Sequence, residues 1–233
     1  MKGVILQPTY LPWLGYFEMI EAADIFIIYD HVQFVKKSWH HRNTIKGANG
    51  EILLSVPIKK TPLNTPLSMT LLADGYEKTL HNHWATISHS YKKAKYYDEY
   101  SLIIESMFLS NYSSLTSLTI SFIEFFCNQL GINTPIEKSS KFLLDSSITD
   151  RSQKVVDLCQ KANISSLYDA RGAQEIMNSD YFTEGNIEII FQKYDHPSYN
   201  QLFGDFLPYM SIIDLLLNEG PKSLQIVKKG RNL

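Results

Sequence analysis

The sequence has little cysteine, no long apolar run and no excess of charge of either sign. Its two cysteines, Cys127 and Cys159, each fall inside an apolar helical pattern, which is typical of buried core thiols and not of a disulfide framework or a zinc cluster. The 22 basic and 24 acidic residues nearly cancel, which argues against a broad nucleic-acid-binding surface. The most apolar stretch, residues 115–126, is interrupted by Ser, Thr and Glu and is shorter than the roughly 20 residues of a spanning helix. We therefore expect no nucleic-acid partner and no membrane span.

The motifs of the common cofactor and hydrolase classes are missing as well. There is no glycine-rich dinucleotide turn, no Walker phosphate loop, no nucleophile elbow and no paired-histidine metal motif. Adjacent His40 and His41 seldom share a metal, and His81 and His83 would point apart on a helix, so we expect no metal site. The sequence names no cofactor. The amino terminus lacks the charged and then apolar run of a signal peptide, which favours a cytoplasmic location.

What the sequence does contain is an alternation of buried strands and helices. Residues 4–6 form a short apolar run that stops at Gln7 and Pro8, apolar residues then recur at helical spacing over 17–23, and a second buried strand covers 25–29. Strand patterns return at 166–168 and 187–191. The order favours an α/β fold with a mostly parallel sheet, a Rossmann-like N-terminal unit and a helical elaboration, all within a single domain spanning residues 1–233.

Further elements follow from local signals. A turn at 47–50 predicts a hairpin between residues 43–45 and 51–59, and residues 67–72 suggest another short strand. Helical periodicity predicts helices over 76–91, 102–109 and 115–130, the last ending at Gly131. Asp150 with Gln153 resembles a capping box, and Ser211 can cap a helix that has Asp214 in its first turn.

The candidate site lies at the ends of the first two strands. In open parallel sheets ligands sit beyond the carboxyl ends of the strands, so polar residues that follow those strands should share one rim. Aromatic rings there can stack on a sugar, and amides can bond its hydroxyls. For Trp13 and Tyr16 the structural alternative is core packing. The candidate substrate-binding residues are Gln7, Tyr10, Trp13, Tyr16, Gln33, Trp39, His40, Arg42 and Asn43, together with His196, Tyr199 and Gln201 from an aromatic loop near the end of the chain.

Two charged groups have separate expected roles. Asp30 is the carboxylate that ends the second buried strand, so it is the candidate catalytic base. Lys36, Lys37 and Arg42 form a basic cluster that can clamp phosphate groups, the alternative being an ordinary solvated loop.

Several of these residues together form a recognisable pattern. The chain carries Gln7-Pro-x-Tyr10-Leu-Pro12-Trp13-Leu-Gly15-Tyr16-Phe17, then Asp30-x-Val32-Gln33-Phe34 and Trp39-x-x-Arg42-Asn43-x-Ile45, and later Tyr199-x-Gln201 with Ser211-Ile-Ile-Asp214. This pattern resembles the WbqC-like family over nearly the whole chain. It departs at residues 168–173, where the family usually has Tyr-x-Ser-Gly-x-x-Ala. The resemblance implies a bacterial role in making a sugar precursor of O-antigen or other surface polysaccharides.

Three functions fit this site. The first is an enzyme that transfers an acyl or aminoacyl group onto a nucleotide-linked amino sugar, with Asp30 as its base. The second is an ATP-using enzyme of the nucleotidyltransferase type, in which Lys36, Lys37 and Arg42 hold phosphates; the signature histidines of that superfamily are absent. The third is a non-catalytic scaffold that binds a sugar nucleotide or another biosynthetic enzyme. Asp30→Asn distinguishes the scaffold from the enzyme: a binding protein tolerates this substitution with little loss of activity in the pathway, whereas a general base does not. The expected partner is a small molecule, and a homodimer is left open.

Overall fold

The computed structural model describes residues 1–232 and is built around a sheet of five parallel strands. In spatial order these are β5 (Ile136–Lys138), β2 (Ile25–Ile28), β1 (Lys2–Leu6), β6 (Ser166–Asp169) and β7 (Glu188–Phe191). The prediction of an α/β fold with a mostly parallel sheet is confirmed. Since the chain leaves β1 toward β2 on one side and places β6 and β7 on the other, the strand order reverses beside β1. Ligands of open α/β sheets bind at such a reversal.

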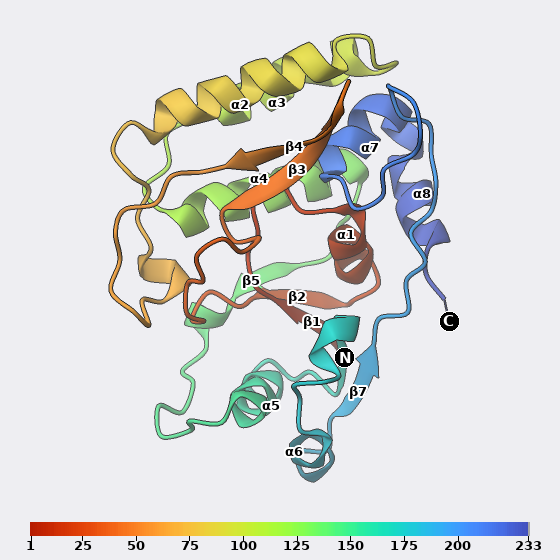
Figure 1. Ribbon diagram of the computed structural model, residues 1–233. Helices are drawn as coiled ribbons and strands as arrows, with labels where there is room; N and C mark the ends of the chain where they lie inside the picture. Colours follow the sequence, from red (N-terminus) through yellow and green to blue (C-terminus); the bar gives the residue numbers. More distant parts are fainter. Residues whose placement is uncertain (233) are drawn as a thin grey trace.

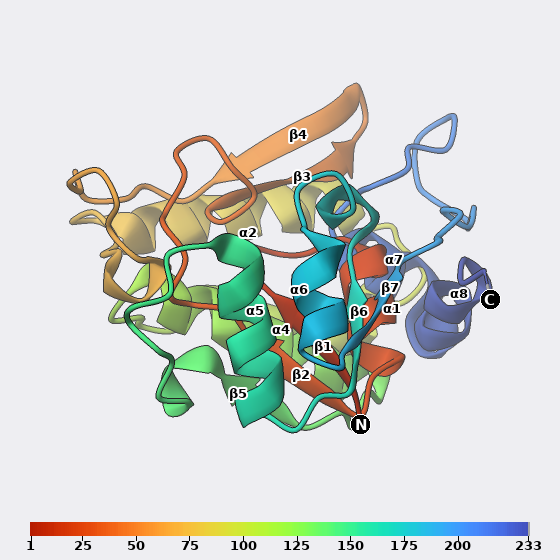
Figure 2. The ribbon, with the colours of Figure 1, turned by 90° about the horizontal axis from the view of Figure 1, so that it is seen from below.

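Side chains of the central strands alternate between two hydrophobic clusters. Val4 and Phe26 face one cluster, whereas Ile5 and Ile27 face the other, as the two-residue repeat of a strand requires. The first face is covered by α1 (Leu14–Glu21), α4 (Leu115–Leu130), α7 (Ile212–Glu219) and α8 (Ser223–Lys229). The second face is covered by α5 (Arg151–Lys161) and α6 (Ser179–Glu184), which lie together below the sheet (Figures 1 and 2).

A separate hairpin lies above the first face. Its strands β3 (Arg42–Gly47) and β4 (Gly50–Ser55) pair antiparallel with Gly47 opposite Gly50, so the predicted hairpin and its turn are confirmed. The long helices α2 (Tyr76–Tyr91) and α3 (Tyr97–Phe108) run above it (Figure 1). Within residues 1–232 there are also four short 3-10 turns, at Leu67–Met69, Ser139–Lys141, Arg171–Ala173 and Gly220–Lys222.

Most helix boundaries follow the predicted signals. The helix α4 ends at Gly131, which adopts a left-handed conformation with φ 74°, and Asp150 caps α5 by accepting from the backbone N–H groups of Ser152 and Gln153. The predicted strand at 67–72 is wrong. Pro66 precedes a 3-10 turn there, and the carbonyl of Thr70 accepts from Leu115 N–H at the start of α4. The elements β5 and α8 were not predicted from the sequence: β5 has only three residues, and α8 follows α7 after one 3-10 turn.

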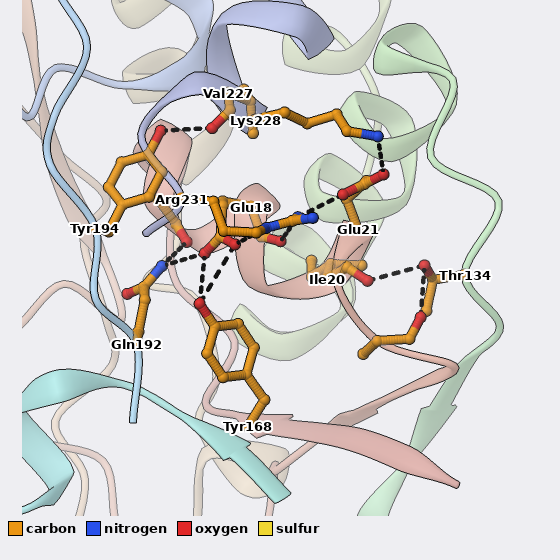
Figure 3. A network of polar contacts seen from close by, with 12 residues as sticks. Glu18, Ile20, Glu21, Thr134, Tyr168, Gln192, Tyr194, Val227, Lys228 and Arg231 are labelled. Carbon is orange, nitrogen blue, oxygen red and sulfur yellow. Dashed lines mark hydrogen bonds and ion pairs between the residues drawn. The ribbon is translucent and has the colours of Figure 1, made fainter. Parts of the chain in front are cut away.

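A buried carboxylate ties the first helix to the far end of the chain (Figure 3). Glu18 of α1 is fully buried, and its oxygens accept from Gln192 Nε2 at 2.6 Å and from the Tyr168 hydroxyl at 3.2 Å. Arg231 lies 2.6 Å from the same carboxylate and also contacts Glu21, which in turn pairs with Lys228. Each charge is thus paired, as burial requires.

The pairing of Glu18 predicts unequal effects for two neighbouring cations. Replacing Arg231 by Ala leaves a buried carboxylate without its counter-charge and should lower the free energy of unfolding by roughly 3 kcal/mol. Lys228→Ala is the control, because Lys228 is half exposed and reaches only Glu21; it should cost about 0–1 kcal/mol. Urea unfolding of both variants checks this, and equal losses would show that Glu18 does not depend on Arg231.

Candidate functional site

The carboxyl ends of the parallel strands bring several predicted residues to one edge. Strands β1 and β2 pair in parallel from Gly3 opposite Ile25 to Leu6 opposite Ile28, and Tyr29 N–H donates to the Leu6 carbonyl. Gln7 and Asp30 therefore leave the sheet at the same edge. Asp169 leaves it there too, at the end of β6 on the other side of β1.

Three adjoining cavities open along this edge. A cavity of about 300 Å³, here called the switch cavity, lies between the ends of β1 and β6 and includes Gln7, Thr9, Tyr16 and Asp169 in its wall. A cavity of about 750 Å³, the cationic cavity, shares Gln7, Tyr29 and Arg151 with it. A third of about 430 Å³, the aromatic cavity, shares Thr9 and Tyr16 with the switch cavity. We refer to the three together as the edge cleft.

The cationic cavity is lined by the first turn of α5 and by the loop before it. Arg151 and Lys154 bring two positive charges, and His31 and Gln33 contribute polar groups from the segment after β2. Asp145 is the one carboxylate in this wall, and hydrogen bonds from Ser147 hold the pKa of its exposed side chain below the usual range. The wall therefore carries a net positive charge, which suits a phosphate or carboxylate ligand.

Asp169 is a carboxylate in the wall of the switch cavity. Its side chain is 7% exposed, and burial raises its pKa to about 6, against the opposing effects of Ala170 N–H and Arg151. The bond from Ala170 N–H, 2.8 Å long, reaches only Oδ1. A carboxylate with a pKa near 6 can take up and release a proton near neutral pH. Asp169 was not predicted as a site residue, although it ends a buried strand just as Asp30 does.

Asp30 lies at the same edge but is covered. It is 4% exposed, and its carboxylate accepts from Ser139 Oγ at 2.8 Å and from Ser140 Oγ at 3.4 Å. His31 Nδ1 lies 3.6 Å away. These contacts join the end of β2 to the end of β5, and Asp30 lines none of the three cavities of the edge cleft. Its role as a base stays a prediction.

The aromatic cavity gathers rings from both ends of the chain. Trp13, Tyr16, Trp39 and Tyr209 line it, and Trp39 is 56% exposed. The Trp13 ring stacks on His196 at 5.9 Å, so His196 supports the wall from behind. Asn43 also reaches the wall, but its amide nitrogen donates to the carbonyls of residues 10 and 11 and holds that loop in place.

Other predicted residues serve the packing around the cleft. Tyr10 is fully buried, and its hydroxyl lies 2.9 Å from Nδ1 of His83 on α2. Lys36 and Lys37 are exposed and line none of the three cavities, and the Arg42 guanidinium sits 6.0 Å from the ring of Trp39. None of Lys36, Lys37 and Arg42 lines the cationic cavity, and the phosphate-binding role predicted for them stays a prediction.

Tyr199 and Gln201 belong to a second buried network, which surrounds Asp214. The Asp214 carboxylate accepts from the hydroxyls of Tyr91 and Tyr199 at 2.8 and 2.7 Å and from Gln201 Nε2 at 2.7 Å. Burial raises its pKa, and these donors oppose the rise. The network links α2, α7 and the loop after β7. None of its side chains lines the aromatic cavity.

The described residues show neither a clustered metal site nor a spanning helix. Within residues 1–232 no three His, Cys, Asp or Glu side chains are grouped so that they could hold a metal ion. None of the helices in that range is both long enough and apolar enough to cross a bilayer.

Comparison with known proteins places the chain in a family. Residues 7–226 match the WbqC-like protein family, and the chain belongs to that family. It is similar to the uncharacterized protein Rv1507c of Mycobacterium tuberculosis, with 32% identity over 225 residues that cover 95% of each chain. No solved structure matches the chain. The predicted family membership is confirmed, and the match includes the walls of the cationic and aromatic cavities and all of the switch cavity's wall except Ile5 and Leu6.

Two buried histidines predict how stability depends on pH. Burial lowers the pKa of His40 and of His83 to about 4. As the pH falls below about 6.5, these histidines take up protons in the unfolded chain before they do so in the folded chain. Each histidine should therefore lower the free energy of unfolding by up to roughly 1.4 kcal/mol per pH unit between about pH 6.5 and 4. Asp169 acts in the opposite direction below about pH 6, because the folded chain holds its proton more tightly.

Urea unfolding of variants between pH 7 and 4 checks this expectation. His83→Asn should make the loss of stability with acid less steep, because it removes a group that only the unfolded chain protonates. His81→Asn is the control, because it makes the same substitution at an exposed position of the same helix. Parallel pH profiles for His83→Asn and the parent would contradict the assignment.

Proposed function

We propose that the protein is an enzyme that transfers an acyl or aminoacyl group onto an amino sugar carried by a nucleotide, within the synthesis of surface polysaccharide precursors. One observation carries this proposal. Asp169, a buried carboxylate with a pKa of about 6, opens into a cavity that joins a cationic cavity on one side and an aromatic cavity on the other. Asp169, as a candidate base, thus lies between the cationic cavity, which suits phosphate groups, and the aromatic cavity, which suits a sugar or nucleobase ring.

The transfer itself needs a proton acceptor. The amine of the sugar forms a bond to the carbonyl carbon of the donor, the donor's leaving group departs with its electron pair, and the amine must lose a proton to become neutral. Asp169 is suited to take that proton. With a pKa of about 6 its side chain is mostly ionised at pH 7, and it binds a proton more tightly than an ordinary aspartate does. In this mechanism Asp30 has a structural role: it joins the end of β2 to the end of β5 by accepting a hydrogen bond from Ser139.

The walls on either side would bind the rest of the substrate. Arg151 and Lys154 supply charges for the phosphates of a nucleotide. Trp13, Trp39 and Tyr209 offer ring faces and edges for the sugar or the nucleobase of the substrate. The same cationic cavity would also suit ATP, so a nucleotidyltransferase-type reaction remains the second candidate, and a scaffold that only binds the sugar nucleotide is the third.

A thermal-shift comparison of ligands should identify the substrate class. A ligand that binds only the folded state and is present at about 100 times its Kd stabilises by about 2.7 kcal/mol, which for a chain of this length raises Tm by roughly 5–10 °C. Uridine and thymidine diphosphate sugars should give this shift, whereas coenzyme A, ATP and Mg²⁺ are tested as alternatives. A shift with ATP alone would favour the second candidate, and no shift with any nucleotide would remove the proposal.

Substitution of the two strand-ending carboxylates then separates their roles. With the sugar nucleotide found in that comparison and its donor, Asp169→Asn should lower kcat by roughly 10²-fold or more. Asp30→Asn should affect stability more than kcat, since its oxygens accept from Ser139 and Ser140. The control is Asp24→Asn, where Asp24 accepts from Lys2 N–H at the opposite edge of the sheet. Full activity of Asp169→Asn with loss in Asp30→Asn would restore Asp30 as the base, and full activity of both would favour the scaffold.

A further inference from the structure

His40 lies behind the edge cleft, where it contacts one of the cleft's polar residues. It is 4% exposed and lines none of the three cavities. One ring nitrogen, Nδ1, lies 3.3 Å from Val35 N–H, and the other, Nε2, lies 2.6 Å from Oε1 of Gln7. Gln7 itself lines both the switch cavity and the cationic cavity.

These contacts determine which ring nitrogen carries the proton. The backbone N–H of Val35 can only donate, so Nδ1 must accept. In a neutral imidazole the proton then resides on Nε2, which must donate to the atom of Gln7 that it contacts. That atom is therefore the amide oxygen. Burial and the neighbouring His41 keep His40 in its neutral form, because they lower its pKa to about 4.

The orientation of Gln7 has a consequence for the cleft. With its oxygen held by His40, the amide presents its nitrogen, a donor only, on the other side. Within residues 1–232 no protein atom accepts from this nitrogen, and it is not among the buried atoms that lack a partner. Arg151 lines both of the cavities that Gln7 lines. A donor and a cation thus border the same space.

We propose that His40 is a positioning residue that holds the Gln7 amide with its N–H toward the edge cleft, where it binds an anionic oxygen of the substrate, a phosphate oxygen in particular. The ligand part of this proposal rests on the proposed function, since it assigns the phosphates of that substrate to the space between Gln7 and Arg151. A group that is itself only a donor, such as an ammonium, is disfavoured at this point because it would face the N–H of Gln7. An amide not held by His40 could turn over and lose this selectivity.

The first measurement needs no substrate. Nitrogen-15 NMR of the histidine side chains at pH 7 should show His40 as a neutral ring protonated on Nε2. A ring protonated on Nδ1, or on both nitrogens, would overturn the proposal whatever the protein binds. His41 is an internal comparison, because its Nδ1 faces the Val56 carbonyl and its Nε2 faces Lys37 N–H, which requires the opposite tautomer.

The second measurement uses inorganic pyrophosphate as the probe in calorimetric titrations at pH 7. His40→Phe should weaken its binding about tenfold, the effect of losing one oriented hydrogen bond to a charged group. The matched control is His41→Phe, which should change binding by less than about twofold. If His40→Phe does not fold, Gln7→Met tests the same donor and should also weaken binding about tenfold.

The outcomes distinguish this inference from the proposed function. Unchanged affinity in His40→Phe or Gln7→Met overturns the inference. A parent protein that does not bind pyrophosphate, yet is stabilised by a nucleotide sugar, overturns it as well and leaves the proposed function in place. Loss of pyrophosphate binding in the variants, in a protein for which Asp169→Asn leaves turnover unchanged, supports the inference and contradicts the proposed base.

Discussion

The arrangement of the sheet's carboxyl edge depends on one buried charge. Glu18 has no exposed surface, so its desolvation must be offset by the groups around it, and these come from three other parts of the chain. Tyr168 belongs to β6, Gln192 follows β7, Arg231 lies near the carboxyl terminus, and Glu18 itself belongs to the helix that begins the site (Figure 3). Because Gln192 also donates to the Gly15 carbonyl, the first turn of α1 is held against the ends of β6 and β7. That contact fixes the side of the switch cavity that Tyr16 provides.

The hairpin and the loop after β7 hold the other wall in a similar way. Asp214 accepts from Tyr91 and Tyr199, so one carboxylate at the start of α7 joins α2 to that loop. The Tyr91 hydroxyl also accepts from Lys46 N–H of β3, which fixes the hairpin beside the same network. The aromatic cavity is lined by Trp13, Trp39 and Tyr209 from three separate segments. The Trp39 carbonyl accepts from Tyr10 N–H, Tyr209 N–H donates to His196 Nε2, and the Trp13 ring stacks on the same His196.

Much of this could be predicted from sequence, and the exceptions have physical causes. The parallel pairing of β1 with β2, the hairpin, and the helices α2 and α4 follow from strong local periodicity and from caps such as Gly131. The three-residue strand β5 has too little pattern to be detected, and without it the sequence could not show that Ser139 covers Asp30. Gln7, which follows β1 directly, and Trp13, at the start of α1, both line cavities of the edge cleft, and their binding role stays a prediction. Tyr10 lines none of these cavities. The sequence does not show that residue 11 has a φ of 48°, in a loop where the Tyr10 side chain is buried against His83.

The buried carboxylates themselves suggest which of them can exchange a proton. Both oxygens of Glu18 accept hydrogen bonds from side chains, as do both oxygens of Asp214 and of Asp30. Carboxylates with both oxygens bonded in this way are held in a fixed position, which is the property of a structural group. Asp169 differs, because among the described residues only Ala170 N–H donates to it, at one oxygen. Its other oxygen has no protein donor there, and the residue borders a cavity at the point where the strand order reverses. Burial raises the free energy of its charged form, and a single donor offsets little of that cost, so the surroundings that make Asp169 a poor structural group suit it to proton transfer.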